Sequence, residues 1–333
     1  MKHALESPTV QAAVNLGGGT NVIVRIIASG TENVRGNITS RALTAGSVTV
    51  LPNSGVSFTL NLNGYLLTLN EGYRLQGFRI KSGDPGGSNN KEAAITLAAA
   101  GTPLKDMLID CKDLGSAGTG TDVGRLGDRC IEVTASSATV TLDNVDVLIK
   151  GDKDYTAGIR HVGPRTILRV INGSSVVATG QGSSGNQGVV GILENSDLGS
   201  VEIEGPNTEV NLSAISPPTS GTPKPNVAIL LKGNSGPLRK VINSQIKVKE
   251  PDPGQTGQIG VCVGSNIDVT VRNNTFTNSS SGSESIAICQ QYGSVSPTPP
   301  DLFTFNTFNR FSTPPPPSAD KRFVTSPDCS CPS

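Results

Sequence analysis

The chain has 333 residues, of which 16% are charged, and its 27 basic residues balance 27 acidic ones. This balance leaves no global field that would attract nucleic acid or an anionic membrane, so neither a nucleic-acid partner nor membrane insertion is expected. The 39 glycines and 22 prolines favour many short strands joined by turns and disfavour long amphipathic helices.

The N-terminal segment, residues 1–19, lacks the apolar core of about 7 to 15 residues that a cleavable signal peptide requires. No stretch of the chain approaches the roughly 20 apolar residues of a membrane-spanning helix. We expect this segment to form a cap or arm that covers the first rung of the strands that follow it.

Between residues 94 and 288, one short motif recurs, in which a small residue precedes a β-branched residue and further apolar positions. Successive branched residues are 27 to 37 residues apart. A second series of strand-like runs, with alternating apolar and polar residues, interleaves with the first at the same pace. The loops between the two series differ in length, as a solenoid permits. The branched residues are Ile95, Ile131, Ile159, Ile192, Ile229, Val261 and Ile288.

This repeat predicts an all-β protein, a parallel β-helix, in which the branched residues stack into inward ladders and bury apolar surface. Asparagines recur between strands of the second series. There we expect turns with left-handed backbone geometry and side-chain amides that bond one another from coil to coil. These asparagines are Asn144, Asn172, Asn243, Asn273 and Asn306.

The coils between residues 70 and 310 resemble the right-handed, pectate-lyase-like superfamily, which includes polysaccharide lyases, polygalacturonases and phage tailspikes. The resemblance is one of architecture. It implies a single-stranded right-handed solenoid over residues 20–311, of about ten irregular coils with capped ends. The Asn-Thr-Asp and Gly-His-Gly elements of polygalacturonases are missing, so no catalytic residue is carried over from that family.

Four aspartates are candidates for chemistry, because an alignment of coils at a spacing of 33 residues stacks Asp110 on Asp143 and Asp113 on Asp146. Adjacent strands lie about 4.8 Å apart, so these carboxylates would share one patch. The patch could supply the acid pair of a glycoside hydrolase, whose carboxyl groups lie about 5 to 9.5 Å apart. Asp113 and Asp146 could instead bind Ca²⁺, as lyases of this fold do. The alternative is that outward aspartates only solvate a strand face.

The same alignment stacks His161 on Glu194 and Arg160 on Glu132. His161 and Glu194 could act as an acid/base couple in which the carboxylate raises the histidine pKa. The second pair indicates an ordinary ladder of surface ion pairs, and this is the alternative for the first pair as well.

Four cysteines are disulfide candidates. Cys262 and Cys289 each follow the branched residue of adjacent coils, which would bring their Cα atoms within the range of about 4.4 to 6.8 Å that a disulfide needs. Cys111 and Cys130 begin and end one coil segment and form the second candidate pair. The chain has only two histidines, and no cysteine spacing fits a zinc site, so no metal bound by Cys and His is expected.

The C-terminal segment, residues 312–333, is a proline-rich tail that contains the last two cysteines. It suits crosslinking between chains or free thiols. Five phenylalanines gather near it and predict either a hydrophobic plug on the last rung or a subunit contact: Phe303, Phe305, Phe308, Phe311 and Phe323.

These features favour a structural or attachment protein of a virion or comparable surface assembly, with a rigid β-helix as scaffold and variable loops for contacts. The expected partners are copies of the chain, other structural proteins or a surface glycan, at a virion surface or in an extracellular assembly. The alternative is a polysaccharide lyase or glycoside hydrolase that acts through stacked aspartates. The structural role needs no cofactor, whereas the enzyme could use Ca²⁺. The chain has no Trp and four Tyr, so a sugar-stacking groove would be thinly equipped.

Overall fold

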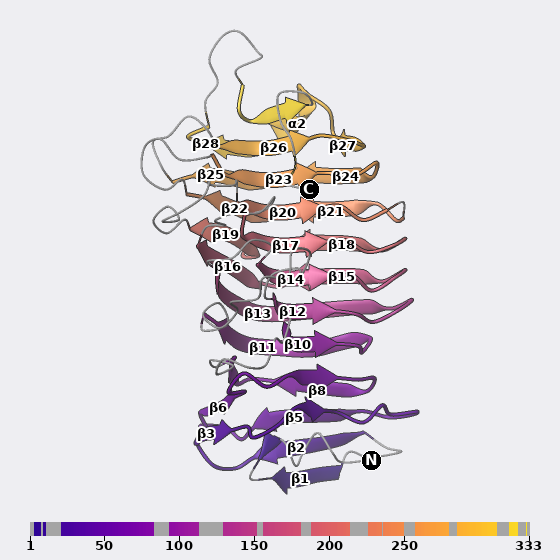
Figure 1. Cartoon of the computed structure of the whole chain (residues 1–333), viewed down its shortest axis with the longest axis vertical. Helices are drawn as coiled ribbons and strands as arrows, with labels where there is room; N and C mark the ends of the chain where they lie inside the picture. Colours follow the sequence, from indigo (N-terminus) through magenta and orange to yellow (C-terminus); the bar gives the residue numbers. More distant parts are fainter. Residues whose placement is uncertain are drawn as a thin grey trace, which may run out of the picture.

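The computed structural model of the chain describes residues 3–7, 9–10, 21–82, 93–112, 129–151, 156–180, 188–213, 226–234, 236–249, 257–279, 285–311, 320–325 and 331. In these residues the chain is a parallel β-helix whose coils stack like rungs from β1 to α2 (Figure 1). The predicted fold class is therefore confirmed. Among the described residues, no helix is long and apolar enough to cross a membrane.

One side of the solenoid, called sheet B here, is a 10-stranded parallel sheet. Its strands are short because each coil turns away at both ends. They are β4 (Ile38–Thr39), β7 (Leu67–Leu69), β10 (Ala93–Leu97), β12 (Arg129–Val133), β14 (Ala157–His161), β17 (Val190–Glu194), β20 (Val227–Leu231), β23 (Ile259–Val263), β26 (Ile286–Gln290) and β29 (Phe323–Thr325).

The other side, sheet A, is a 19-stranded sheet that forms two columns meeting at a corner. The first column comprises β2 (Val22–Ile26), β5 (Val48–Pro52), β8 (Tyr73–Gln76), β15 (Ile167–Ile171), β18 (Ser200–Glu204), β21 (Arg239–Ile242), β24 (Asp268–Arg272) and β27 (Ser294–Ser296), with β1 (His3–Ser7) paired to β2. The second comprises β3 (Gly30–Asn33), β6 (Phe58–Asn61), β9 (Arg79–Lys81), β16 (Ser175–Gly180), β19 (Glu209–Ser213), β22 (Gln245–Val248), β25 (Thr275–Asn278) and β28 (Thr307–Asn309). Two long strands, β11 (Gly101–Cys111) and β13 (Thr139–Gly151), pass through both columns.

In seven described coils the corner between the two columns begins with a residue in left-handed backbone geometry, which Gly, Asn and Asp tolerate best. This confirms the predicted turns at four asparagines. The same prediction is wrong for Asn306, whose backbone is extended with a φ of −128°. We call the following set the corner residues: Gly77, Asp106, Asn144, Asn172, Gly205, Asn243 and Asn273.

The predicted bonding between corner amides is replaced by amide-to-carboxylate bonds. Asn144 Nδ2 donates to Asp106 Oδ1 at 2.9 Å, and Asn172 Nδ2 donates to Asp143 Oδ1 at 2.9 Å. An amide-to-amide hydrogen bond occurs instead between two buried asparagines beside the corner. In this bond Asn274 Nδ2 donates to Asn306 Oδ1 at 3.1 Å.

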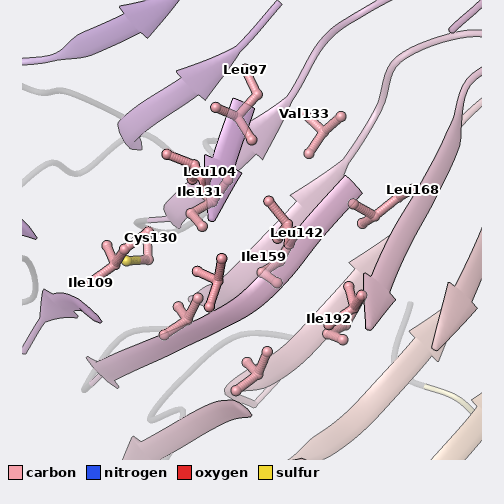
Figure 2. Close-up of a cluster of buried hydrophobic side chains, with 14 of the residues drawn as sticks. Leu97, Leu104, Ile109, Cys130, Ile131, Val133, Leu142, Ile159, Leu168 and Ile192 are labelled. Atoms are coloured by element: carbon pink, nitrogen blue, oxygen red, sulfur yellow. The ribbon is translucent and has the colours of Figure 1, made fainter. Parts of the chain in front are cut away.

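The core is the interior of the solenoid. All seven branched residues of the repeat are register partners in successive strands of sheet B, and all have 0% exposure. Figure 2 shows Ile131, Ile159 and Ile192 of this ladder in one cluster with Leu142 and Leu168 of sheet A. Each inward side chain therefore packs against the coil above, the coil below and the opposite sheet.

The C-terminal end of the core is closed by aromatic side chains. The rings of Phe276 and Phe308 are stacked with centroids 5.1 Å apart, Phe311 is buried, and Phe303 and Phe323 pack against the core. The predicted plug is therefore confirmed for four of the five phenylalanines and is wrong for Phe305, which is exposed. The plug is completed by the short helix α2 (Asp301–Phe305).

Parallel strands extend past both limits that the sequence predicted for the solenoid. β1 lies within 1–19 and pairs with β2, and β29 lies within 312–333 and pairs with β26. The domain limits and the number of coils stay predictions.

One predicted disulfide is confirmed and one is wrong. Cys111 and Cys130 are bonded, with Cα atoms 5.6 Å apart. Cys262 and Cys289 are register partners as predicted, but Cys262 is bonded to Cys331, at a Cα separation of 5.7 Å. In-register residues of parallel strands hold their Cβ atoms side by side at about 4.8 Å, whereas a disulfide needs about 3.8 Å.

Two adjacent valines of β16 test the inward ladder. Val176 is fully buried in the core, and Val177 is half-buried on the outer face. We expect Val176→Ala to lower the free energy of unfolding by about 2 kcal/mol, because it leaves a cavity between packed coils. Val177→Ala is the matched control and should cost less than about 1 kcal/mol. Chemical denaturation measures both, and equal losses would contradict the assignment of the two faces.

Candidate functional site

A hollow opens on sheet A over β5, β8, β11 and β13. Side chains in these strands alternate between the core and the outside, so outward residues of neighbouring coils meet there. Cationic, amide and hydroxyl groups line it beside one carboxylate. This sheet-A hollow is lined by Thr49, Arg74, Leu75, Gln76, Thr102, Lys105 and Asp143.

Three lining residues occupy the same place in successive coils, one position before the corner residue. Gln76 is the register partner of Lys105, and Lys105 is the register partner of Asp143. Lys105 Nζ lies 3.1 Å from Asp143 Oδ2. The corner geometry therefore brings a cation and a carboxylate from different coils into direct contact.

The Lys105–Asp143 ion pair perturbs both groups. Burial would raise the pKa of Asp143, but hydrogen bonds from Asn172 and Lys105, together with the Lys105 charge, lower it. The hydrogen bond to Asp143 and the charges of Asp143 and Asp106 raise the pKa of Lys105. Both groups are thus held in their charged forms at neutral pH.

The predicted stack of Asp110 on Asp143 is wrong. Asp110 is the register partner of Lys81 and Leu148, and its carboxylate forms an ion pair with Arg79. Asp143 pairs with Lys105, 38 residues earlier, whereas the prediction assumed a spacing of 33. Because loop lengths vary, an average coil length does not give the register.

The predicted stack of Asp113 on Asp146 is also wrong. The register partners of Asp146 are Leu108 and Ser175, and Asp113 lies outside the described residues. Asp146 is exposed, and desolvation of its carboxyl group by neighbouring atoms raises its pKa. A Ca²⁺ site at Asp113 and Asp146 therefore stays a prediction without support from the register.

His161 and Glu194 are register partners, as predicted, but they lie inside the solenoid with 0% exposure. Glu194 accepts hydrogen bonds from Ser196 Oγ at 2.8 Å and Gly233 N at 3.1 Å, and its Oε1 lies 3.4 Å from Arg239 Nη2. The Glu194 carboxylate is therefore bound by hydrogen-bond donors and a cation that the sequence pattern did not predict as its neighbours.

The pKa of His161 is lowered to about 4 by burial and by the charge of Arg239. The prediction that Glu194 raises it is therefore wrong, because desolvation disfavours the imidazolium ion and the charge of Arg239 lowers the pKa further. The second pair follows the prediction, since Arg160 Nη1 lies 3.1 Å from Glu132 Oε1 and both side chains are half-buried. Arg129 Nη1 joins it at 3.2 Å.

Sequence reasoning found no cluster of basic residues and missed Arg74 and Lys105, which line one hollow. The signal that could have found it is the corner residue. If coils are aligned on Gly77, Asp106 and Asn144 instead of on average length, Gln76, Lys105 and Asp143 fall into one row.

Comparisons with known proteins identify neither a family nor a site. No family model matches the chain, and no curated protein matches it. Among solved structures it is similar to a mannuronic-acid-specific polysaccharide family 6 lyase from human gut microbiota. That match covers 98% of this chain and 91% of that one, at 13% identity and a TM-score of 0.31. At these values no residue or activity is transferred.

The buried histidine predicts a specific acid sensitivity. Unfolded His161 gains a proton below its ordinary pKa of 6.5, whereas the folded protein resists protonation until about pH 4. The free energy of unfolding therefore falls as the pH drops from 6.5 to 4, by about 3 kcal/mol from this residue. Chemical denaturation at a series of pH values measures this effect. Between pH 6.5 and 4 the free energy of unfolding of His161→Gln should decline less steeply than that of the unchanged chain, and His3→Gln measures the contribution of the other histidine. An unchanged slope in His161→Gln would contradict a buried neutral imidazole.

Proposed function

We propose that the chain is a non-catalytic structural or attachment protein, a rigid β-helix that binds a surface glycan through the sheet-A hollow and partner proteins through its loops. The observation that carries this proposal is the engagement of the candidate acids. Asp110 and Asp143 each form an ion pair with a cation of the preceding coil.

Paired carboxylates for glycoside hydrolysis need one acid that is protonated and one that is ionised, facing each other across a sugar. Asp143 has a lowered pKa and two donors bound to its oxygens. Asp146 lies between Leu108 and Ser175 in its column. These neighbours do not supply the matched second carboxylate.

An acid/base role for His161 and Glu194 is equally poorly supported. Both side chains are buried inside the solenoid, where a polysaccharide does not reach them. With a pKa of about 4, His161 is neutral at pH 7, and Glu194 is held by Arg239. This cluster supports a structural role where Arg239 of β21 in sheet A packs against Glu194 of β17 in sheet B.

The hollow suits a polar, hydroxyl-rich ligand. Arg74 and Lys105 offer cationic donors, Gln76 offers an amide, and Thr49 and Thr102 offer hydroxyl groups. No aromatic ring is among the lining residues, so affinity would come from hydrogen bonds and charge. An acidic glycan fits this chemistry best, and its binding would weaken as salt screens the cations.

The biological setting that we propose is a virion or comparable surface assembly, with copies of the chain as further partners. Sequence features support this setting, because the strand motifs recur along the chain with loops of very different length between them. Surface loops are where a rigid scaffold makes its contacts.

The alternative function is a polysaccharide lyase or glycoside hydrolase. One observation favours a lyase, namely that Arg74 and Lys105 line the same hollow. A lyase needs a base to take a proton beside a uronate carboxylate, and cations to neutralise that carboxylate. Lys105 would first have to release Asp143, because the ion pair keeps its amine protonated.

One experiment separates these functions. The purified chain is incubated with acidic and neutral polysaccharides, with and without Ca²⁺, and polymer length is followed by size-exclusion chromatography while binding is followed by retention on immobilised glycan. We expect unchanged polymers and salt-sensitive retention of an acidic glycan that Arg74→Ala reduces several-fold. Arg169→Ala is the matched control, because Arg169 lies on sheet A outside the hollow and pairs with Glu202.

Shortened polymers would overturn the non-catalytic role. Loss of cleavage in Lys105→Ala would then place a lyase site in the hollow, whereas loss in Asp113→Asn with Asp146→Asn would place it on the aspartates. If no glycan is retained, the glycan part of the proposal fails and only a scaffold role is left.

A further inference from the structure

The outer face of sheet B carries an apolar stripe that is buried, in contrast to the polar outer face of sheet A. It consists of Ala157, Val190, Leu193, Val227, Leu230, Ile259, Cys262, Cys289, Val324 and Cys331. Its three cysteines come from three separate parts of the chain, and strand register brings the first two together.

The three sulfur atoms form a compact cluster. All of them lie within 4.8 Å of one another, and the Sγ atoms of Cys289 and Cys331 are 3.9 Å apart. Cys262 and Cys331 are joined as a disulfide, and Cys289 is disulfide-bonded as well. The exposure of the three residues is 0%, 0% and 8%. Once the disulfides are reduced, three buried cysteine sulfurs at this separation match the spacing of thiolate ligands around one metal ion.

We propose that, in the reduced chain, Cys262, Cys289 and Cys331 form a thiolate site for a soft d¹⁰ metal ion such as Zn²⁺. Reduction of each disulfide takes two electrons and two protons and gives two thiols. A dithiol supplies them by becoming a disulfide, and a phosphine supplies them together with one water molecule by becoming a phosphine oxide. The metal ion then displaces one proton from each of its three thiol ligands. The same cluster is thus a covalent clasp when oxidised and a metal centre when reduced.

The distances suit such an ion. Zinc binds sulfur at about 2.3 Å in tetrahedral geometry, which places ligand sulfurs about 3.8 Å apart. The Cys289–Cys331 distance of 3.9 Å already has this value. Cys262 needs only to move its sulfur away from Cys331 once their bond is open, because the β23–β26 ladder holds the backbones of Cys262 and Cys289.

The anchoring of Cys331 does not depend on its disulfide alone. Its backbone N donates to Gln291 Oε1 at 3.0 Å, so the third ligand has a hydrogen bond to the body of the solenoid. The described sulfurs form a three-ligand set without Cys329, which lies outside the described residues. Three protein ligands leave a fourth position for water or another donor.

Close packing bounds the cluster on one side. A side-chain atom placed on Gly264 would lie 3.2 Å from Cys331 Cβ and 3.3 Å from Lys232 Cγ. The backbone at Gly264 and the stem of Lys232 therefore lie beside the third ligand.

Sequence spacing gave no sign of this site, because its ligands lie far apart in the chain. Cys262 and Cys331 are 69 residues apart, and Cys289 comes from the next coil. The usual short cysteine pairs of zinc sites are therefore absent from this set. Only the stacking of coils assembles it.

The test uses the full chain, reduced anaerobically with a phosphine, incubated with Zn²⁺ or Cd²⁺ and desalted. Retained metal is measured by elemental mass spectrometry, and Cd²⁺–thiolate coordination by its charge-transfer absorption in the ultraviolet. We expect equimolar retention in the reduced chain and none in the oxidised one. Cys289→Ser should lose the metal, because only two sulfurs remain. The double variant Cys111→Ser/Cys130→Ser is the matched control and should keep both metal and absorption.

Three results would overturn the site: equal retention by oxidised and reduced chains, retention that survives Cys289→Ser, or loss in the Cys111/Cys130 control. Circular dichroism of each variant checks that the strands are intact. Where Cys289→Ser does not fold, Cys331→Ser serves instead and should lose the metal for the same reason, while metal retained by that variant would count against the site. Glycan retention is measured in parallel, so failure of the metal site and failure of the glycan role are told apart.

Discussion

The whole structure depends on register between stacked parallel strands. Each residue of a coil meets one partner above and one below at about 4.8 Å, so a position keeps the same face and neighbours along the axis. One corner residue per coil sets the phase, because left-handed geometry fixes where the chain passes from one column of sheet A to the next. Gly, Asn or Asp fills that place in seven described coils. The Lys105–Asp143 pair, the buried Glu194 and the sulfur cluster all follow from which residues this register superimposes.

This dependence explains what could be predicted from the sequence. The small-then-branched motif predicted the inward ladder from Ile95 to Ile288 correctly, since it marks a strand position directly and needs no assumption about loops. The aspartate stacks failed because they rested on an average coil length. Between Asp110 and Asp143 the chain deviates from that average by several residues, and a shift of even one residue moves a side chain to the opposite face. The asparagine turns, read as local geometry, were right at four of five positions for the same reason that the ladder was.

Other features had no local signal. The pKa of His161 is set by burial and by Arg239, which lies two coils further along the chain. Arg239 is in sheet A and contacts Glu194 of sheet B. The disulfide partner of Cys262 comes from the end of the chain. Such contacts join residues that the repeat does not align with each other, so periodicity does not indicate them. The chemistry of the outer surface is also difficult to predict. The alternating pattern requires apolar residues at the inward positions, but it does not restrict the residue types at the outward positions.

The aromatic closure of the C-terminal end has a consequence for assembly. A stack of in-register parallel strands resembles the core of an amyloid fibril, in which each new chain adds to an open edge. Phe276, Phe308 and Phe311, with α2 beside them, cover the apolar interior where the last coil would otherwise offer it to another molecule. The closure therefore ends, at the C-terminal tip, a stacking geometry that could otherwise continue from one molecule into the next.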